Sequence, residues 1–208
     1  MQLEDLTPAS ADEYTILCLR NIGPYENNIF VVADPASGEA YILDAGYEPE
    51  EVARAVEGLR VRAILVTHGH RDHHEHAQEL RQLVGVPLGI GADDASMLGF
   101  APDFTIHDGQ TLPFGTRSLR AIHTPGHTPG STCFLLDNEQ HLFTGDTLFP
   151  GGPGNTQRDP QRFARIIDSI RDRLFVLSDE TVVYPGHGRD TTIGQERPHL
   201  DEWIARGW

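Results

Sequence analysis

The sequence contains no lysine, and all 16 of its basic residues are arginines. This absence excludes an enzyme that forms a Schiff base with its substrate or uses a lysine as general base. Positive charge of any kind is scarce, because 31 acidic residues leave a formal net charge of -15 at pH 7. Since nucleic-acid binding depends on clustered positive charge, we expect no nucleic-acid partner.

Long apolar segments and cysteines are scarce as well. No apolar run reaches the roughly 18 residues of a membrane-spanning helix, so we expect no membrane partner. The segment Met1 to Asp5 lacks the basic stretch and apolar core of a signal peptide, which predicts a cytoplasmic location. Cys18 and Cys133 lie far apart in apolar runs. They could form one disulfide, but in a cytoplasmic protein we interpret them as buried, reduced thiols.

The residues that are present have the composition of an ordinary globular protein, with 38% hydrophobic and 23% charged residues among 208. Strand-like and helix-like segments alternate, which is typical of the α/β class. We find no linker, low-complexity segment or domain boundary. The sequence therefore predicts one domain, residues 1–208, made of two similar halves.

Runs rich in β-branched and aromatic residues, bounded by glycine and proline turns, predict the strands. They lie at 14–20, 28–33, 40–43, 61–67, 86–90, 104–106, 118–123, 132–136, 141–144 and 181–184. Apolar residues at helical spacing predict helices at 49–59, 74–84, 93–98, 160–175 and 191–208. We expect the first three strands to pair as an antiparallel meander.

One short stretch concentrates residue types that bind metals. From Thr67 the sequence reads Thr-His-Gly-His-Arg-Asp-His, which places His68, His70, Asp72 and His73 directly after a predicted strand. Imidazole nitrogen and carboxylate oxygen suit zinc, iron and manganese. Because residues two apart do not share a helix face, we expect a loop in which these side chains converge. A solvated, histidine-rich turn is the alternative interpretation.

Three further candidates follow later β-rich runs, namely His127, Asp146 and His187. Like His70, each is directly preceded by a glycine, which lets the backbone turn sharply and leaves room beside a metal. Taken alone, a glycine followed by one of these residues predicts only a turn. Together with the first stretch they exceed what one tetrahedral ion needs. The set suits two ions, one bound by three histidines and one by an aspartate and two histidines, with a carboxylate between them.

These motifs resemble those of the metallo-β-lactamase-fold hydrolases, in particular the short, single-domain proteins similar to glyoxalase II. The resemblance covers nearly the whole chain and implies an αββα sandwich with a metal site at one edge of the two sheets. It implies two divalent metal ions, zinc first, with iron or manganese as alternatives. The implied ligands are His68, His70 and His127 for the first ion, Asp72, His73 and His187 for the second, and Asp146 as the bridge.

The predicted reaction is the hydrolysis of a small-molecule acyl thioester, with Asp72 and Asp146 as the catalytic residues. Two cations about 3.5–4 Å apart can hold a hydroxide at neutral pH, and this metal-bound hydroxide would attack the carbonyl. A thiol leaving group with a pKa near ~8.5 needs little help from a general acid, and the sequence offers no obvious one. True β-lactamases of the superfamily usually lack a histidine that matches His73, which argues against lactam hydrolysis.

Other functions remain open at this point. A persulfide dioxygenase of the same fold would hold one iron through residues that match His68, His127 and Asp146. A lactonase would cleave an ester with a far more basic leaving group. An inactive metal-binding module is disfavoured, because loss of activity usually removes a ligand. Glyoxalase II has a C-terminal helical region that grips glutathione, and the residues after His187 are too few to form it, so the thiol stays open, as does the oligomeric state.

Several supporting residues have two interpretations. Asp44 is either a turn former or a carboxylate that holds a metal-binding histidine. His123 either supports the site or packs within a strand. Arg158, in the glycine-rich segment 149–158 that we expect to shape the pocket, either pairs with a substrate carboxylate or lies on the surface. The remaining histidines are interpreted as surface or helix residues rather than ligands, namely His74, His76, His107, His141 and His199.

Overall fold

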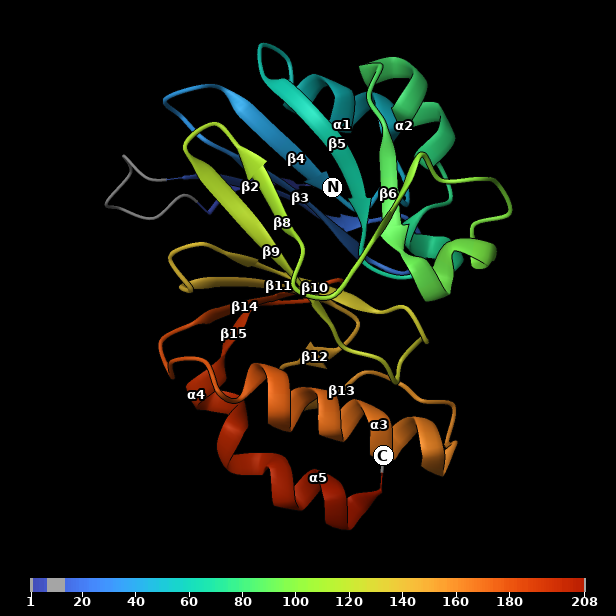
Figure 1. Ribbon diagram of the computed structural model, residues 1–208, viewed down its shortest axis with the longest axis vertical. Helices are drawn as coiled ribbons and strands as arrows, with labels where there is room; N and C mark the ends of the chain where they lie inside the picture. Colours follow the sequence, from blue (N-terminus) through green and yellow to red (C-terminus); the bar gives the residue numbers. More distant parts are fainter. Residues whose placement is uncertain (1, 7–13, 208) are drawn as a thin grey trace.

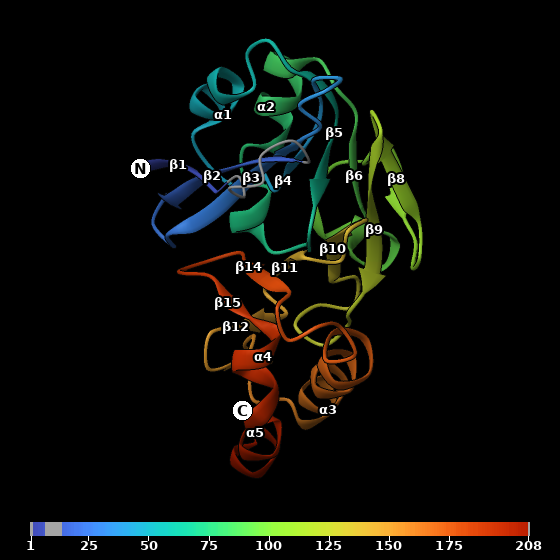
Figure 2. The same ribbon diagram turned by 90° about the vertical axis from the view of Figure 1, so that its left-hand side faces the viewer.

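Two β-sheets pack face to face in the computed structural model, and helices cover the outer face of each sheet (Figures 1 and 2). The predicted αββα sandwich of the α/β class is therefore confirmed. The structure describes residues 2–6 and 14–207, and Met1, residues 7–13 and Trp208 lie outside the described part.

The first sheet contains seven strands in the order β1-β2-β3-β4-β5-β6-β7. They are β1 Gln2–Asp5, β2 Thr15–Ile22, β3 Asn27–Ala33, β4 Glu39–Leu43, β5 Arg60–Val66, β6 Leu88–Gly91 and β7 Phe104–Ile106. Strands β1 to β4 pair antiparallel, and β2 to β4 form the predicted meander, whereas β1 was not predicted. Strands β4 to β7 pair in parallel. Because parallel strands end at the same edge of a sheet, the residues that follow β4 and β5 leave it side by side.

The second sheet contains six strands in the order β15-β14-β11-β10-β9-β8. They are β8 Thr111–Phe114, β9 Arg117–His123, β10 Thr132–Leu136, β11 His141–Gly145, β14 Val182–Pro185 and β15 Thr191–Thr192. Strand β14 runs parallel to β11, so the segments that follow these two strands also leave at one edge. A small hairpin of β12 Leu148–Phe149 and β13 Gly152–Pro153 lies between the second sheet and its helices (Figure 1).

Helices α1 Pro49–Ala55 and α2 Ala77–Val84 cover the first sheet, and α3 Pro160–Ser169, α4 Ile193–Glu196 and α5 Leu200–Arg206 cover the second (Figure 1). The start of α3 is fixed by Asp159, whose Oδ1 accepts hydrogen bonds from the amides of Gln161 and Arg162. Within the described residues, every helix is too short or too polar to cross a lipid bilayer.

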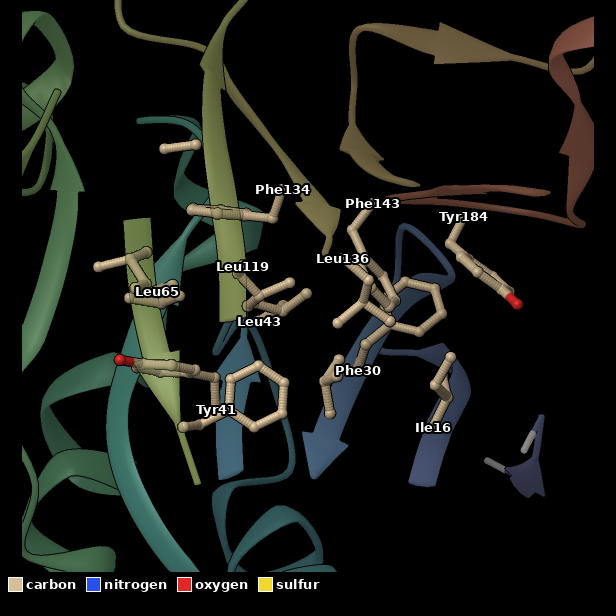
Figure 3. Packing of buried hydrophobic residues seen from close by; sticks show 14 of the residues in the cluster. Ile16, Phe30, Tyr41, Leu43, Leu65, Leu119, Phe134, Leu136, Phe143 and Tyr184 are labelled. Carbon is tan, nitrogen blue, oxygen red and sulfur yellow. The ribbon is translucent and has the colours of Figure 1, made fainter. Parts of the chain in front are cut away.

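The core has three apolar layers, one between the sheets and one under each set of helices. Between the sheets, the Phe30 ring meets the rings of Phe143 and Tyr184 at centroid distances of 5.2 and 5.6 Å (Figure 3). Such edge-to-face pairs add to the free energy gained by burying apolar surface. Cys18 and Cys133 are both buried and unpaired, as interpreted from the sequence.

Some helix boundaries differ from the prediction. The helix expected at 49–59 ends at Ala55, and the chain then turns through Gly58, which has a φ of 84°. The helix expected at 74–84 begins only at Ala77, because residues 71–73 form a separate 3₁₀ turn. The helix expected at 93–98 is a 3₁₀ turn over Ala92–Met97.

The C-terminal part differs more. The predicted helix 160–175 changes after Ser169 into a π-helical turn, Ile170–Leu174, although its apolar stripe is buried as expected. The tail expected as one helix over 191–208 begins as β15, and a 3₁₀ turn at Pro198 separates α4 from α5. Proline inside a helix removes a hydrogen bond and clashes with the preceding turn. Trp208, the last residue of that prediction, lies outside the described residues.

Candidate metal centre

All seven predicted ligands meet at the edge where β5, β11 and β14 end. His68, His70, Asp72 and His73 come from the loop after β5 and the 3₁₀ turn within it. The other three follow the ends of strands in the second sheet, His127 between β9 and β10, Asp146 after β11 and His187 after β14. The sandwich thus joins a contiguous motif from one sheet to three separate residues from the other.

The first group is made of three histidines whose ring nitrogens converge. The Nε2 atom of His68 lies 3.2 Å from Nδ1 of His70, which lies 2.8 Å from Nε2 of His127. One nitrogen from each ring lies within 4.8 Å of the other two. Neutral imidazoles gathered in this way can bind one cation.

The second group is made of Asp72, His73 and His187. The Nε2 atoms of the two histidines lie 3.1 Å apart, and Asp72 Oδ2 lies 3.5 Å from the first and 3.4 Å from the second. The side-chain amide of Asn27 donates a 3.0 Å hydrogen bond to the same Asp72 oxygen and orients it. This group supplies one carboxylate and two imidazoles, which also fits a divalent cation.

Asp146 lies between the two groups. Its Oδ2 atom is 3.4 Å from His127 Nε2, and its Oδ1 atom is 3.4 Å from His73 Nε2 and 3.5 Å from His187 Nε2. Among the described residues, Oδ1 is buried without a hydrogen-bond donor in reach. Burial of an unpartnered carboxylate oxygen is costly, and cations held by the two groups would remove that cost. The donor atoms therefore fit two divalent metal ions, although the ligand role of each residue stays a prediction.

Backbone carbonyls fix two of the histidine rings through the ring nitrogen that faces away from the centre. His127 Nδ1 lies 2.8 Å from the carbonyl oxygen of Asn155, and His187 Nδ1 lies 2.8 Å from that of Tyr25. Since a carbonyl only accepts hydrogen bonds, both Nδ1 atoms carry the proton. The Nε2 lone pairs are then directed into the centre, as metal binding requires.

Asp44 has the supporting role that was one of its two interpretations. This buried residue follows β4 with a φ of 67°, and its Oδ2 lies 2.8 Å from His73 Nδ1. The same carboxylate accepts hydrogen bonds from the Thr67 amide at 2.7 Å and from the Thr67 hydroxyl at 3.0 Å. Asp44 therefore orients one histidine of the second group and fixes the start of the loop after β5 that carries four of the candidate ligands.

Replacing Asp44 with asparagine is expected to weaken metal binding to the second group by roughly 10- to 100-fold, because the His73 ring loses its charged partner. Competition with a chromophoric chelator measures this change. Asp34→Asn is the matched control, since Asp34 is also buried but binds Ser37 and Thr116 in turns remote from the centre. Equal metal affinity in wild type and Asp44→Asn would contradict this role.

Burial keeps the first group neutral. It lowers the pKa of His127 to about 4, and it lowers the pKa of His68 well below the ordinary histidine value. At neutral pH both rings are therefore free of the second proton that would block a metal ion.

In the second group, by contrast, the surroundings favour a protonated histidine. Burial disfavours the charged form of His187, but the carboxylates of Asp146 and Asp72, 3.5 and 3.4 Å from its Nε2, favour that form and raise its pKa to about 9. Without metal, a proton thus occupies the position between these groups. A cation binding there displaces it, so protons and metal ions compete for the second group.

Two of the glycines that precede ligands show why the residue is needed. A Cβ atom on Gly186 would lie 2.6 Å from Asp146 Oδ1 and 2.6 Å from His73 Cε1, inside the centre itself. At Gly126, which has a φ of 144°, the crowding comes instead from Ile166 in α3. The expected space beside the metal is therefore found at Gly186, whereas Gly126 permits the close approach of a helix.

Asp94 is a supporting residue that the sequence did not reveal. It is fully buried, and it accepts hydrogen bonds from the amides of Gly69 and Gly130 at 2.8 and 2.7 Å and from the Thr128 hydroxyl at 2.5 Å. It thereby ties the loop after β5 to the turn that carries His127. No local pattern marks it, since an aspartate in a short polar segment reads as a surface residue.

Arg20 holds the loop that carries His187. Its guanidinium group is buried and binds the carbonyl of Gly188 at 2.9 Å, Asp190 Oδ2 at 2.6 Å and Glu4 Oε2 at 2.5 Å. The Asn28 side chain also donates to the Gly188 carbonyl, at 2.9 Å. These contacts explain how an irregular loop can hold a ring in one position.

Two histidines outside the centre differ from their interpretation as surface or helix residues. His74 and His141 are both buried, the first with Nε2 3.2 Å from the Gly69 carbonyl and the second with Nδ1 3.0 Å from the Tyr184 hydroxyl. Neither belongs to the converging groups, as expected. His123 supports the site indirectly, because its Nε2 lies 2.8 Å from the Pro129 carbonyl in the turn that carries His127.

Two hollows flank the centre, and the glycine-rich segment 149–158 shapes both, as predicted. One hollow of ≈ 420 Å³ lies beside His187 and is lined by Tyr25, Glu26, Phe149, Pro150, Gly188 and Arg189. The other, of ≈ 630 Å³, is lined by residues 153–156 together with Arg158 and Gly207. Arg158 is exposed there, and its pairing with a substrate carboxylate stays a prediction.

Known proteins match the chain over most of its length. The model of the metallo-beta-lactamase superfamily matches residues 22–187. Hydroxyacylglutathione hydrolase GloC from Haemophilus influenzae is 33% identical over 193 residues, which cover 83% of this chain and 91% of GloC. The probable polyketide biosynthesis zinc-dependent hydrolase BaeB from Bacillus velezensis is 31% identical over 180 residues, covering 85% of this chain and 79% of BaeB.

Solved structures show the same fold. TTHA1623 in a di-iron-bound form is 29% identical, with a TM-score of 0.71 over 86% of this chain and 96% of its own. ETHE1 from Myxococcus xanthus is 25% identical, with a TM-score of 0.75 over 100% of this chain and 90% of its own.

Proposed function

Because the chain belongs to the metallo-beta-lactamase superfamily, we propose that it is a metal-dependent hydrolase that cleaves a small-molecule acyl thioester. The observation that carries the proposal is the second group of Asp72, His73 and His187, which is complete and lies on the far side of Asp146 from the first. A site for one ion alone would not need it. Similarity to GloC supports a hydroxyacylglutathione as the first substrate to test.

We propose two divalent cations as the cofactors, with zinc first and iron or manganese as alternatives. Similarity to BaeB, which is zinc-dependent by name, supports zinc, and similarity to a di-iron-bound protein supports two ions and leaves iron open. Bound cations supply Lewis acidity that lowers the pKa of water and polarises a carbonyl.

The protein's own carboxylates are suited to orient the attacking water. Burial opposes the ionisation of Asp146, but the facing rings of His73 and His187 lower its pKa well below the ordinary value. Its Oδ1 therefore remains a hydrogen-bond acceptor at neutral pH, directed at the space between the groups. Asp72 is likewise ionised, because His187 and His73 outweigh burial and lower its pKa.

The nature of the leaving group separates a thioester from an ester or an amide. A thiol with a pKa of about 8.5 can leave as the thiolate anion, without receiving a proton from the enzyme. As metal ligands, the histidines at the centre would have no free nitrogen facing the substrate, and carbonyls hold the outer nitrogens of His127 and His187, so none is placed to protonate a basic leaving group. The chemistry of the site therefore favours a thioester over a lactone.

We further propose a small-molecule substrate rather than a nucleic acid, in keeping with the net charge of -15. A cytoplasmic, reducing location is also proposed, and two buried cysteines that stay unpaired support it.

An activity panel tests the proposal. Purified protein with its native metals is expected to cleave acyl thioesters with a kcat/KM at least about 100-fold above that for lactones, and to consume no oxygen with a persulfide. The dioxygenase alternative instead predicts one iron per chain, held by His68, His127 and Asp146, and oxygen uptake. A preference for lactones would replace the proposal with a lactonase. Inactivity of the metal-loaded protein towards all three substrates would point to a binding module.

A further inference from the structure

Three arginines of this acidic protein have no carboxylate, backbone carbonyl or aromatic ring as a partner among the described residues. In the part of the chain that the structure describes, no carboxylate lies within ion-pair distance of Arg158, Arg165 or Arg189, and all three are exposed. Most other arginines bind a carboxylate, a backbone carbonyl or an aromatic ring. An arginine left without a partner among so many acidic residues is available to bind an anion from solution.

Arg189 is the one beside the second metal-binding group. It lies two residues after His187 and lines the hollow of ≈ 420 Å³. The Phe149 ring stacks along the His187 ring in that hollow, with centroids 6.3 Å apart and planes at 28°. Tyr25 is held in place because its carbonyl binds His187 Nδ1, while its side chain is 65% exposed. The hollow thus combines two aromatic surfaces and one free cation directly beside a candidate ligand.

We propose that this hollow binds one limb of the thioester, meaning either its acyl portion or its thiol portion, and that this limb is anionic. A carboxylate or phosphate on it pairs with Arg189, whose planar guanidinium group binds either through two parallel hydrogen bonds. The apolar part of the limb packs against Tyr25 and Phe149. The inference rests on the proposed function, since it concerns the same site.

Glu26 gives the proposal a second, opposite test. It lines the same hollow as Arg189, and no ion pair joins the two side chains in the described structure. Its carboxylate repels an anionic limb, so removing its charge should improve binding, whereas removing the charge of Arg189 should weaken it. A purely structural role of either residue would not produce opposite effects on the same substrate.

The experiment compares three thioesters, one with a carboxylate on the thiol side, one with a carboxylate on the acyl side, and one neutral. Arg189→Gln is expected to raise KM about tenfold for one of the two anionic substrates, with kcat changed less than about twofold. Glu26→Gln is expected to lower KM for that same substrate. The substrate affected identifies the limb that enters the hollow. Arg165→Gln is the matched control, an equally unpaired and exposed arginine on α3 outside the hollow, and should change nothing.

Binding separates failure of this inference from failure of the proposed function. Calorimetry with thioether analogues, in which the thioester carbonyl is replaced by a methylene group, needs no turnover. A roughly tenfold weaker Kd of the anionic analogue in Arg189→Gln supports the subsite even if no thioester is cleaved. The inference is overturned if Arg189→Gln leaves the Kd and KM of both anionic compounds unchanged, or if the neutral compounds are affected equally.

Discussion

Replacing Asp146 with asparagine is expected to lower kcat/KM for a thioester by at least about 1000-fold, which corresponds to about 4 kcal/mol of transition-state stabilisation. Among the described residues, Asp146 has one carboxylate oxygen facing each group, with Oδ2 towards His127 and Oδ1 towards His73 and His187. An asparagine keeps the shape of the side chain but offers a single acceptor and no charge. Both of the groups that would hold a metal ion therefore lose a carboxylate oxygen at once.

Steady-state kinetics and metal content per chain measure the effect of Asp146→Asn. Asp137→Asn is a suitable control, because Asp137 accepts a 3.0 Å hydrogen bond from the Ser118 amide on a strand turn outside the centre. The control should retain full activity. A variant Asp146→Asn that keeps near wild-type turnover would exclude catalysis at this centre. The dioxygenase alternative also uses Asp146, so this variant distinguishes an enzyme from a binding module.

Removing the metal ions with a chelator is expected to abolish hydrolysis and to lower Tm by roughly 10 °C for each site lost. A ligand present at about 1000 times its Kd contributes about 4 kcal/mol to the free energy of unfolding, and a protein of this size loses ~2–4 °C for each kcal/mol. The protein is expected to lose stability without metal because lone pairs crowd at the centre. Ring nitrogens 2.8 to 3.2 Å apart repel each other unless a cation or proton lies between them.

Calorimetry, and activity assays after stepwise addition of metal, check this expectation. Full activity should require two equivalents of zinc, manganese or iron. The far-ultraviolet circular dichroism of the chelated protein should be nearly unchanged, because three apolar layers hold the sheets and helices without the centre. Unchanged hydrolysis in protein shown to be metal-free would contradict the proposed function. Full activity with one iron and oxygen would favour the dioxygenase instead.

Local sequence patterns were sufficient for most of the regular elements. The strands β7 at Phe104–Ile106 and β10 at Thr132–Leu136 were predicted to the residue, because short apolar runs between turn residues encode them. Strand β8 was not predicted, since Pro113 lies within it and proline normally argues against a strand. It tolerates the proline because it forms the edge of its sheet. The π-helical turn after α3 also escaped prediction, because its apolar spacing continues that of the helix.

The sequence by itself determined the class of fold and the seven candidate ligands, because periodicity, glycine positions and metal-binding residue types are local properties of the chain. Only the tertiary structure decided which of two roles Asp44 has, since the pairing of Leu43 with Leu65 brings it beside Thr67. The structure likewise decided that Asp94 joins two loops and that Arg189 faces a hollow. These outcomes depend on contacts between residues distant in the chain, and such contacts exist only once the two sheets have packed together.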